Sequence, residues 1–154
     1  MRSLFFRWIP VLFWMGVIFK ASTDAFSAQH TGSVLVPFLI RLFPHLSAEA
    51  IDMIHFCIRK GAHLAEYSIL AMLLWRAVPE RKARPDAVDW GRAGVALAVA
   101  TFYGATDEFH QIFVPSRGAS VHDVLIDACG AAITLTCVCL VSRRRAARKS
   151  AAAA

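Results

Sequence analysis

Apolar runs separated by basic residues constrain this chain more than any other feature of its sequence. Four runs cover about residues 4–19, 62–78, 93–114 and 121–141, with Lys and Arg residues concentrated in the gaps between them. Of the 154 residues, 57% are hydrophobic and only 18% are charged. A soluble domain of this length needs more polar surface to cover its core, so the composition predicts that lipid surrounds much of the folded chain.

These runs predict an all-α fold, an integral membrane four-helix bundle. Ser47 fits an N-cap with Glu49 in the first turn, so the second helix is expected to begin near Ala48. Ser120 and Asp123 match a capping box before the fourth run. Residues 21–43 hold an apolar stretch too short to span, which predicts an interfacial segment between the first two helices. Residues 4–141 then form one transmembrane domain, followed by a basic, alanine-rich cytoplasmic tail over 142–154.

The distribution of positive charge predicts the orientation. Twelve of the seventeen Lys and Arg residues fall on one side of the four runs, and the richer side of a membrane protein is cytoplasmic. Both termini are therefore expected in the cytoplasm, with the polar residues gathered near the outer side. An alternative for residues 1–28 is a cleaved signal peptide, which would leave the orientation of the rest unchanged. Nucleic acid is not an expected partner, because the basic residues do not alternate with aromatics and no nucleic-acid-binding motif occurs.

Helical periodicity collects the polar side chains into stripes. The stripe on the second helix consists of Asp52, His55, Arg59, His63 and Glu66, with Lys60 and Tyr67 at its edge. The stripe on the third helix consists of Tyr103, Asp107, His110 and Gln111, and Glu108 is expected to point elsewhere. The stripe on the fourth helix consists of Ser120, Asp123, Asp127, Gly130 and Thr134.

All three stripes fall at the same predicted depth, and charge that faces lipid is costly. We therefore expect them to turn toward one another around an outward-opening pocket. Its predicted lining is His63, Glu66, Asp107, His110, Arg117, Asp123 and Asp127.

The residue types in this pocket permit several kinds of chemistry. His63 or His110 beside a carboxylate can act as a general base. Lys60 and Arg117 can hold a phosphate or a carboxylate. Two histidines with Asp or Glu can bind a divalent cation, but the spacing favours no particular metal and leaves the cofactor open. The alternative is structural: Asp107 can form an ion pair with Lys60 or Arg117 that only holds helices together, and Gly130 can permit close helix approach.

Three segments resemble the VanZ-like family of membrane proteins over about residues 14–140. They are Lys60-Gly-Ala-His-Leu-Ala-Glu-Tyr67, Asp107-Glu-Phe-His-Gln-Ile-Phe-Val-Pro-Ser-Arg117 and Asp123-Val-Leu-Ile-Asp-Ala-Cys-Gly130. Ser116 departs from the Gly that often follows the proline, and the segment after Lys20 matches loosely. The family is named for a protein that confers low-level resistance to the glycopeptide antibiotic teicoplanin. The resemblance implies a multi-pass protein of the bacterial inner membrane connected with the cell envelope, but no reaction.

Three functional hypotheses are compatible with these residues, and the sequence leaves open whether the protein is an enzyme. The first is binding of an envelope component or envelope-directed compound. The ligand-binding candidates are Lys60, Tyr67, Glu108, Gln111, Arg117, Asp123 and Asp127. The second is an intramembrane enzyme acting on a lipid-linked or cell-wall precursor, with the catalytic candidates His63, Glu66, Asp107 and His110. The third is a purely structural polar network. The expected partners are the lipid bilayer and an envelope lipid, a cell-wall precursor or a glycopeptide.

Overall fold

The computed structural model describes residues 2–80 and 88–153, and within these ranges the chain is helical with no β strand. The elements in chain order are α1 (Arg2–Ala21), the short 3₁₀ helix η1 (Asp24–Phe26), α2 (Ala28–Leu42), α3 (Ala48–Ala77), α4 (Trp90–Gln111) and α5 (Val121–Ala153). The all-α prediction is therefore confirmed. Arg81, Lys82 and Arg84, which the orientation prediction used, lie outside the described residues.

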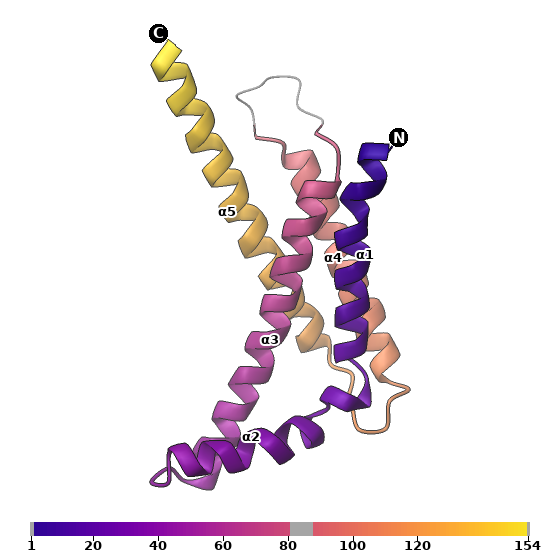
Figure 1. Cartoon of the computed structure of the whole chain (residues 1–154), viewed down its shortest axis with the longest axis vertical. Coiled ribbons are helices and arrows are strands. Elements are labelled where there is room, and N and C mark those ends of the chain that lie inside the picture. The colour runs from indigo at the N-terminus through magenta and orange to yellow at the C-terminus, as the bar shows by residue number, and fades with distance from the viewer. Residues whose placement is uncertain (1, 81–87, 154) are drawn as a thin grey trace.

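Four helices, α1, α3, α4 and α5, run along the long axis, and α2 crosses near one end (Figure 1). That end, called the α2 end below, also holds η1 and the connection between α4 and α5. The opposite end, called the terminal end, holds the start of α1, the end of α3, the start of α4 and the end of α5. Both termini thus lie at one end, as the charge distribution predicted.

The segment predicted to be interfacial contains η1 and α2, and the chain turns sharply between α1 and these helices. The α1 axis and the η1–α2 axis differ by 73°. Ser27 caps α2 by accepting a hydrogen bond from the His30 N–H at 3.3 Å. Helix α2 leaves apolar side chains exposed, with Val34 74% and Phe38 58% accessible. Its position in a membrane interface stays a prediction.

Close packing between α3 and α5 organises the core. A Cβ built on Gly130 would lie 2.4 Å from the Leu64 carbonyl oxygen, so only glycine permits this approach. The Ser68 hydroxyl donates to the Gly130 carbonyl at 3.1 Å. On the other side of α3, the Trp14 Nε1–H of α1 donates to the Glu66 carbonyl at 2.9 Å. The buried core between these contacts includes Tyr67, Leu70 and Leu74.

Of the two predicted N-terminal caps, the structure confirms one and corrects the other. Ser47 caps α3 as predicted, accepting from the Ala50 N–H. The predicted capping box of Ser120 and Asp123 is wrong, because the Ser120 N–H donates to Glu108 Oε2 at 2.7 Å instead of to Asp123. Asp123 instead forms an ion pair with Lys60. Helix α5 also continues through the predicted tail as far as residue 153.

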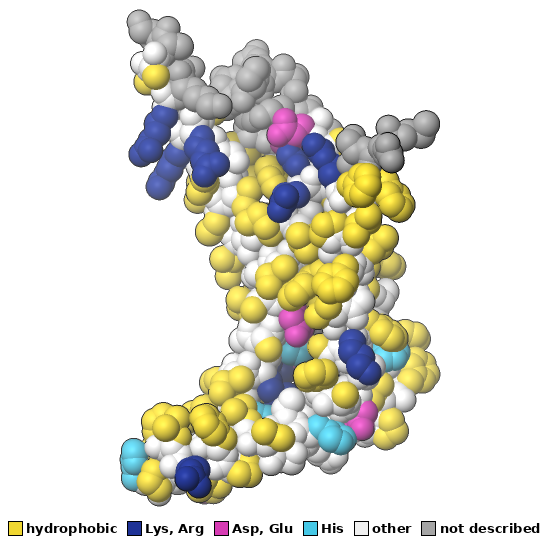
Figure 2. Space-filling model, in the orientation of Figure 1, with side chains coloured by type: hydrophobic (Ala, Val, Ile, Leu, Met, Phe, Trp, Pro, Cys, Tyr) yellow, Lys and Arg dark blue, Asp and Glu magenta, His cyan; other side chains and the backbone are white. Residues whose placement is uncertain are grey.

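Apolar side chains cover much of the molecular surface between the two ends (Figure 2). Among the described residues, one helical stretch, Val121–Arg148, is long and apolar enough by itself to cross a membrane. The bent pair formed by Phe5–Ala21 and Asp24–Leu42 passes the same test when its two parts are taken together. Helices α3 and α4 are long, but charged residues interrupt their apolar sequence.

Candidate functional site

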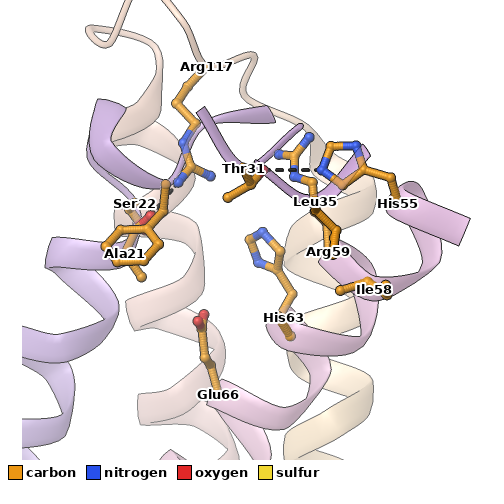
Figure 3. A pocket seen from close by; sticks show the side chains of 12 residues that line it. Ala21, Ser22, Thr31, Leu35, His55, Ile58, Arg59, His63, Glu66 and Arg117 are labelled. Atoms are coloured by element: carbon orange, nitrogen blue, oxygen red, sulfur yellow. Dashed lines mark hydrogen bonds between the residues drawn. The ribbon is translucent and has the colours of Figure 1, made fainter. Parts of the chain in front are cut away.

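A pocket of about 180 Å³ opens at the α2 end, between the end of α1, helices α2 and α3, and the α4–α5 connection (Figure 3). We call it the α2-end pocket. Its polar lining is Ser22, Thr31, His55, Arg59, His63, Glu66 and Arg117, and its apolar lining is Ala21, Phe26, Leu35, Ile58 and Ala62. The predicted stripe on the second helix therefore supplies one wall, and segments far away in the sequence supply the others.

Arg117 anchors the α4–α5 connection to the end of α1. Its Nη2 donates to the carbonyl oxygens of Ala21 and, at 3.2 Å, of Thr23. The neighbouring Ser116 hydroxyl donates to Asp24 Oδ1. The Arg117 Nε is buried and has no hydrogen-bond partner among the described residues. The connection is thus fixed in place while part of the guanidinium still has hydrogen-bonding capacity.

Two guanidinium groups border the same pocket. Arg59 comes from α3 and Arg117 from the α4–α5 connection. Burial, and next the positive charge of Arg59, lower the pKa of Arg117. Arg117 nevertheless stays protonated at neutral pH, because an arginine begins from such a high pKa. Two like charges beside one small cavity favour an anionic ligand.

His63 lines the pocket with a carboxylate behind it. Its ring points into the pocket (Figure 3), and its Nδ1 lies 3.3 Å from Asp127 Oδ1. Asp127 is completely buried, and a Cβ on Gly104 of α4 would lie 3.3 Å from its Oδ2. A carboxylate at this distance can orient an imidazole and stabilise its protonated form.

Behind the pocket, a second group of polar side chains joins Ser22, which follows the end of α1, to α3, α4 and the start of α5. Lys60 forms an ion pair with Asp123. Gln111 Nε2 donates to Asp107 Oδ2 and to Glu108 Oε1, both at 3.1 Å. The Ser22 hydroxyl donates to Asp107 Oδ2 at 2.6 Å. We call this group, with the Ser120 N–H bonded to Glu108, the buried carboxylate network.

The structure divides the predicted site residues between these two groups. His63, Glu66 and Arg117 line the α2-end pocket. Lys60, Asp107, Glu108, Gln111 and Asp123 belong to the buried carboxylate network, and Tyr67 and Asp127 are buried beside it. His110 packs its ring on Phe19, with ring centroids 4.7 Å apart. Glu108 was expected to point elsewhere, and this was wrong, because α5 packs on that side of α4 and turns its carboxylate inward.

Four polar residues of the pocket were not predicted from the sequence: Ser22, Thr31, His55 and Arg59. His55 and Arg59 share the predicted stripe with His63 at spacings of four residues, and this regular spacing was the signal for including them. Thr31 and His55 contact each other at 3.2 Å between Oγ1 and Nε2, joining α2 to α3. No pattern in the sequence pointed to Ser22 or Thr31.

Several buried polar atoms near the pocket have no hydrogen-bond partner in the described part of the chain. They are Tyr67 Oη, Asp107 Oδ1, His110 Nδ1, His63 Nδ1 and both carboxylate oxygens of Asp127. The His63–Asp127 contact has the distance of an ion pair but not the angles of a hydrogen bond. Because buried polar atoms nearly always have partners, this region offers unused capacity for water or a polar ligand.

The geometry gives no support for the divalent-cation alternative. Within residues 2–80 and 88–153, no three His, Cys, Asp or Glu side chains come close enough together to hold a metal ion. The acidic groups of the buried carboxylate network are instead neutralised by Lys60 or held by hydrogen bonds.

Two apolar grooves adjoin the α2-end pocket. The first, of about 650 Å³, runs along α1 and is lined by Leu12, Phe13, Gly16, Val17, Lys20, Ala21, Phe26 and Glu66. The second, of about 550 Å³, runs along α2 and is lined by Ala25, Phe26, His30, Thr31, Val34, Leu35 and Phe38. Each groove shares residues with the pocket, and Phe26 borders all three spaces. A charged recess and two apolar grooves therefore lie next to one another.

Comparison with known proteins identifies a family. A family model described as VanZ/LLP1 matches residues 6–142, which is most of the chain. No curated protein matches, and no solved structure matches.

Proposed function

The chain belongs to the VanZ/LLP1 family, and from this membership and the site geometry we propose that it is a multi-pass membrane protein that binds an anionic, amphipathic compound of the cell envelope. The α2-end pocket receives the anionic group. The adjoining grooves receive the apolar part.

The membrane placement is supported by where the polar and apolar side chains lie. Helices α1, α3, α4 and α5 form the four crossings of the bilayer, with the apolar surface between the two ends facing the acyl chains. The terminal end, which carries the Arg residues of the α5 tail, faces the cytoplasm of a bacterium. The α2 end then lies at the outer surface of the inner membrane, and α2 rests in the interface.

One observation carries the binding proposal. Arg59 and Arg117 border one small cavity from two separate segments, and that cavity shares lining residues with two apolar grooves. Arginine pairs well with phosphate and carboxylate because its planar donors match their oxygens. A phosphorylated envelope lipid or a lipid-linked cell-wall precursor has both required parts. A glycopeptide of the teicoplanin type is the further candidate that the family resemblance implies.

Removing one guanidinium tests this proposal. The full-length protein is purified in neutral detergent, and its binding of a polyprenyl phosphate and of teicoplanin is measured separately. Arg59→Ala is expected to weaken binding of the true ligand class about tenfold or more, since a charge-assisted hydrogen bond contributes roughly 1.5–3 kcal/mol. Arg41→Ala is the matched control, because it removes an exposed arginine from α2 that does not line the pocket. Equal affinities for Arg59→Ala and the unsubstituted protein would contradict the proposal.

A second candidate function, acid-base catalysis on a lipid-linked or cell-wall precursor, is favoured by the His63–Asp127 contact. A histidine that faces a pocket and is backed by a buried carboxylate has the arrangement of a general base. His63→Gln separates the two functions. An enzyme loses turnover of the precursor with little change in its binding, whereas a binding protein shows no turnover in either form.

A further inference from the structure

A second charged cavity, of about 400 Å³, lies near the terminal end, far from the α2-end pocket. Arginines from three helices line it: Arg7 of α1, Arg76 of α3 and Arg92 of α4. Phe6, Leu73 and Trp75 supply apolar and aromatic surface beside them. We call it the arginine cavity. In the sequence, these arginines indicate only the orientation of the chain.

Among the described residues that line this cavity, three are arginines and none is acidic. Arg92 Nη1 contacts Glu80 Oε1 at 3.2 Å, and the Glu80 side chain is 55% exposed. Within the described ranges, neither Arg7 nor Arg76 forms an ion pair. Three guanidinium groups that line one cavity repel one another, so an anion bound between them would stabilise the arrangement.

Arg92 is buried and stacks on an aromatic ring. Only 7% of the residue is accessible, and its guanidinium carbon lies 4.5 Å from the centroid of the Trp75 ring. This stacking fixes the plane of the guanidinium group. Its Nε is buried without a hydrogen-bond partner among the described residues. A buried donor of this kind normally has an acceptor, and its neighbours in the cavity include two further cations.

We propose that the arginine cavity binds a phosphate group, as a second site independent of the α2-end pocket. Arg92 supplies the fixed, buried donor, and Arg7 and Arg76 close on the phosphate from the more exposed side. Phosphate is the anion that suits this set, because three guanidinium groups can share its several oxygens. The phosphate comes either from an anionic phospholipid, whose acyl chains would lie on Phe6 and Leu73, or from a soluble phosphate compound.

The test uses the full-length protein in neutral detergent with two probes. Native mass spectrometry measures binding of phosphatidylglycerol, and calorimetry measures binding of inorganic phosphate. Arg76→Ala and Arg7→Ala are the informative variants, because both side chains are exposed and their removal leaves the Arg92–Trp75 stacking intact. Each is expected to lower the affinity of the probe that binds about tenfold, the change expected for one lost charge-assisted contact.

Two controls distinguish this site from the α2-end pocket. Arg144→Ala removes an exposed arginine at the same end that does not line the cavity, and Arg59→Ala removes one from the α2-end pocket. Both controls are expected to keep the binding that Arg76→Ala loses. A loss with phosphatidylglycerol alone identifies a lipid headgroup, and a loss with inorganic phosphate identifies a soluble ligand. Unchanged binding of both probes by Arg76→Ala and Arg7→Ala would overturn the proposal, whatever the outcome at the α2-end pocket.

Discussion

The α2-end pocket and the buried carboxylate network lie side by side, yet their charged groups are used differently. In the network, each carboxylate has at least one close partner: Lys60 pairs with Asp123, and Gln111 bridges Asp107 and Glu108, although Asp107 Oδ1 has no partner among the described residues. In the pocket, Arg59 and Arg117 border the same space, and the Arg117 Nε has no hydrogen-bond partner among the described residues. Paired buried groups can hold helices together, whereas groups with unused donors remain available to a ligand.

This contrast predicts that substitutions behind the pocket reduce stability and that substitutions within it change binding. Four experiments test this separation of stability from binding, in order of decreasing expected effect.

Gly130→Leu should have the largest effect, because its Cβ would lie 2.4 Å from the backbone oxygen of Leu64. Helices α3 and α5 would have to separate, which we expect to cost about 3 kcal/mol or more. Thermal unfolding in detergent and the yield of monodisperse protein report the loss. Gly61→Leu is the matched control on α3, since nothing lies within 4 Å of its added Cβ. Equal stabilities of the two variants would show that the α3–α5 contact is looser than described.

Asp123→Ala leaves the Lys60 ammonium without its partner. The Lys60 side chain is 25% exposed and that of Asp123 is 9% exposed. We expect a loss of about 2 kcal/mol, less than for a fully buried pair because Lys60 keeps some contact with water. The double variant Lys60→Met, Asp123→Leu should recover most of this stability. Thermal unfolding of the two single variants and the double variant measures the coupling. Additive losses would contradict a structural pair.

Glu66→Gln tests the pocket side of the comparison. Glu66 is the one acidic residue in the described lining of the α2-end pocket, beside Arg59 and Arg117. Removing its negative charge should strengthen anion binding about fivefold, roughly 1 kcal/mol, with little change in thermal stability. Titration with the polyprenyl phosphate used for Arg59→Ala measures the change. Weaker binding by Glu66→Gln would mean that the carboxylate itself contacts the ligand.

Trp14→Phe should have the smallest effect. It removes the 2.9 Å hydrogen bond from Nε1 to the Glu66 carbonyl and keeps most of the aromatic packing. The expected cost is about 1 kcal/mol in the free energy of unfolding, the usual contribution of one hydrogen bond. Trp90→Phe is the control, because Trp90 is 63% exposed. If both variants unfold at the same temperature as the unsubstituted protein, the hydrogen bond contributes nothing to the free energy of unfolding.

How much of this could be read from the sequence depended on distance along the chain. Local periodicity placed His63 and Glu66 on one face of α3. The N-cap predicted at Ser47 depends on a short-range signal and is confirmed. Lys60 and Arg59 are adjacent in sequence but belong to different groups. Lys60 forms an ion pair with Asp123 on α5, whereas Arg59 lines the α2-end pocket. That choice depends on a partner 63 residues away, which no local pattern encodes.

The capping box failed for the same reason. Ser120 and Asp123 have the residue types and spacing of a capping box. The Ser120 N–H, however, donates to Glu108 of α4, and Asp123 pairs with Lys60. Glu108 itself was assigned to the wrong side, because a helical projection shows one face at a time and α4 packs against more than one helix. Tertiary contacts therefore overrode local chemistry where three helices meet.

Phe26, in the three-residue η1, borders the α2-end pocket and both apolar grooves. A molecule that occupied all three spaces would have to divide into branches at this ring. The ring would then separate one hydrocarbon chain from another and set the number of chains that the protein accepts. With a smaller side chain at position 26 the two grooves would join, and such a molecule would no longer be divided at this point.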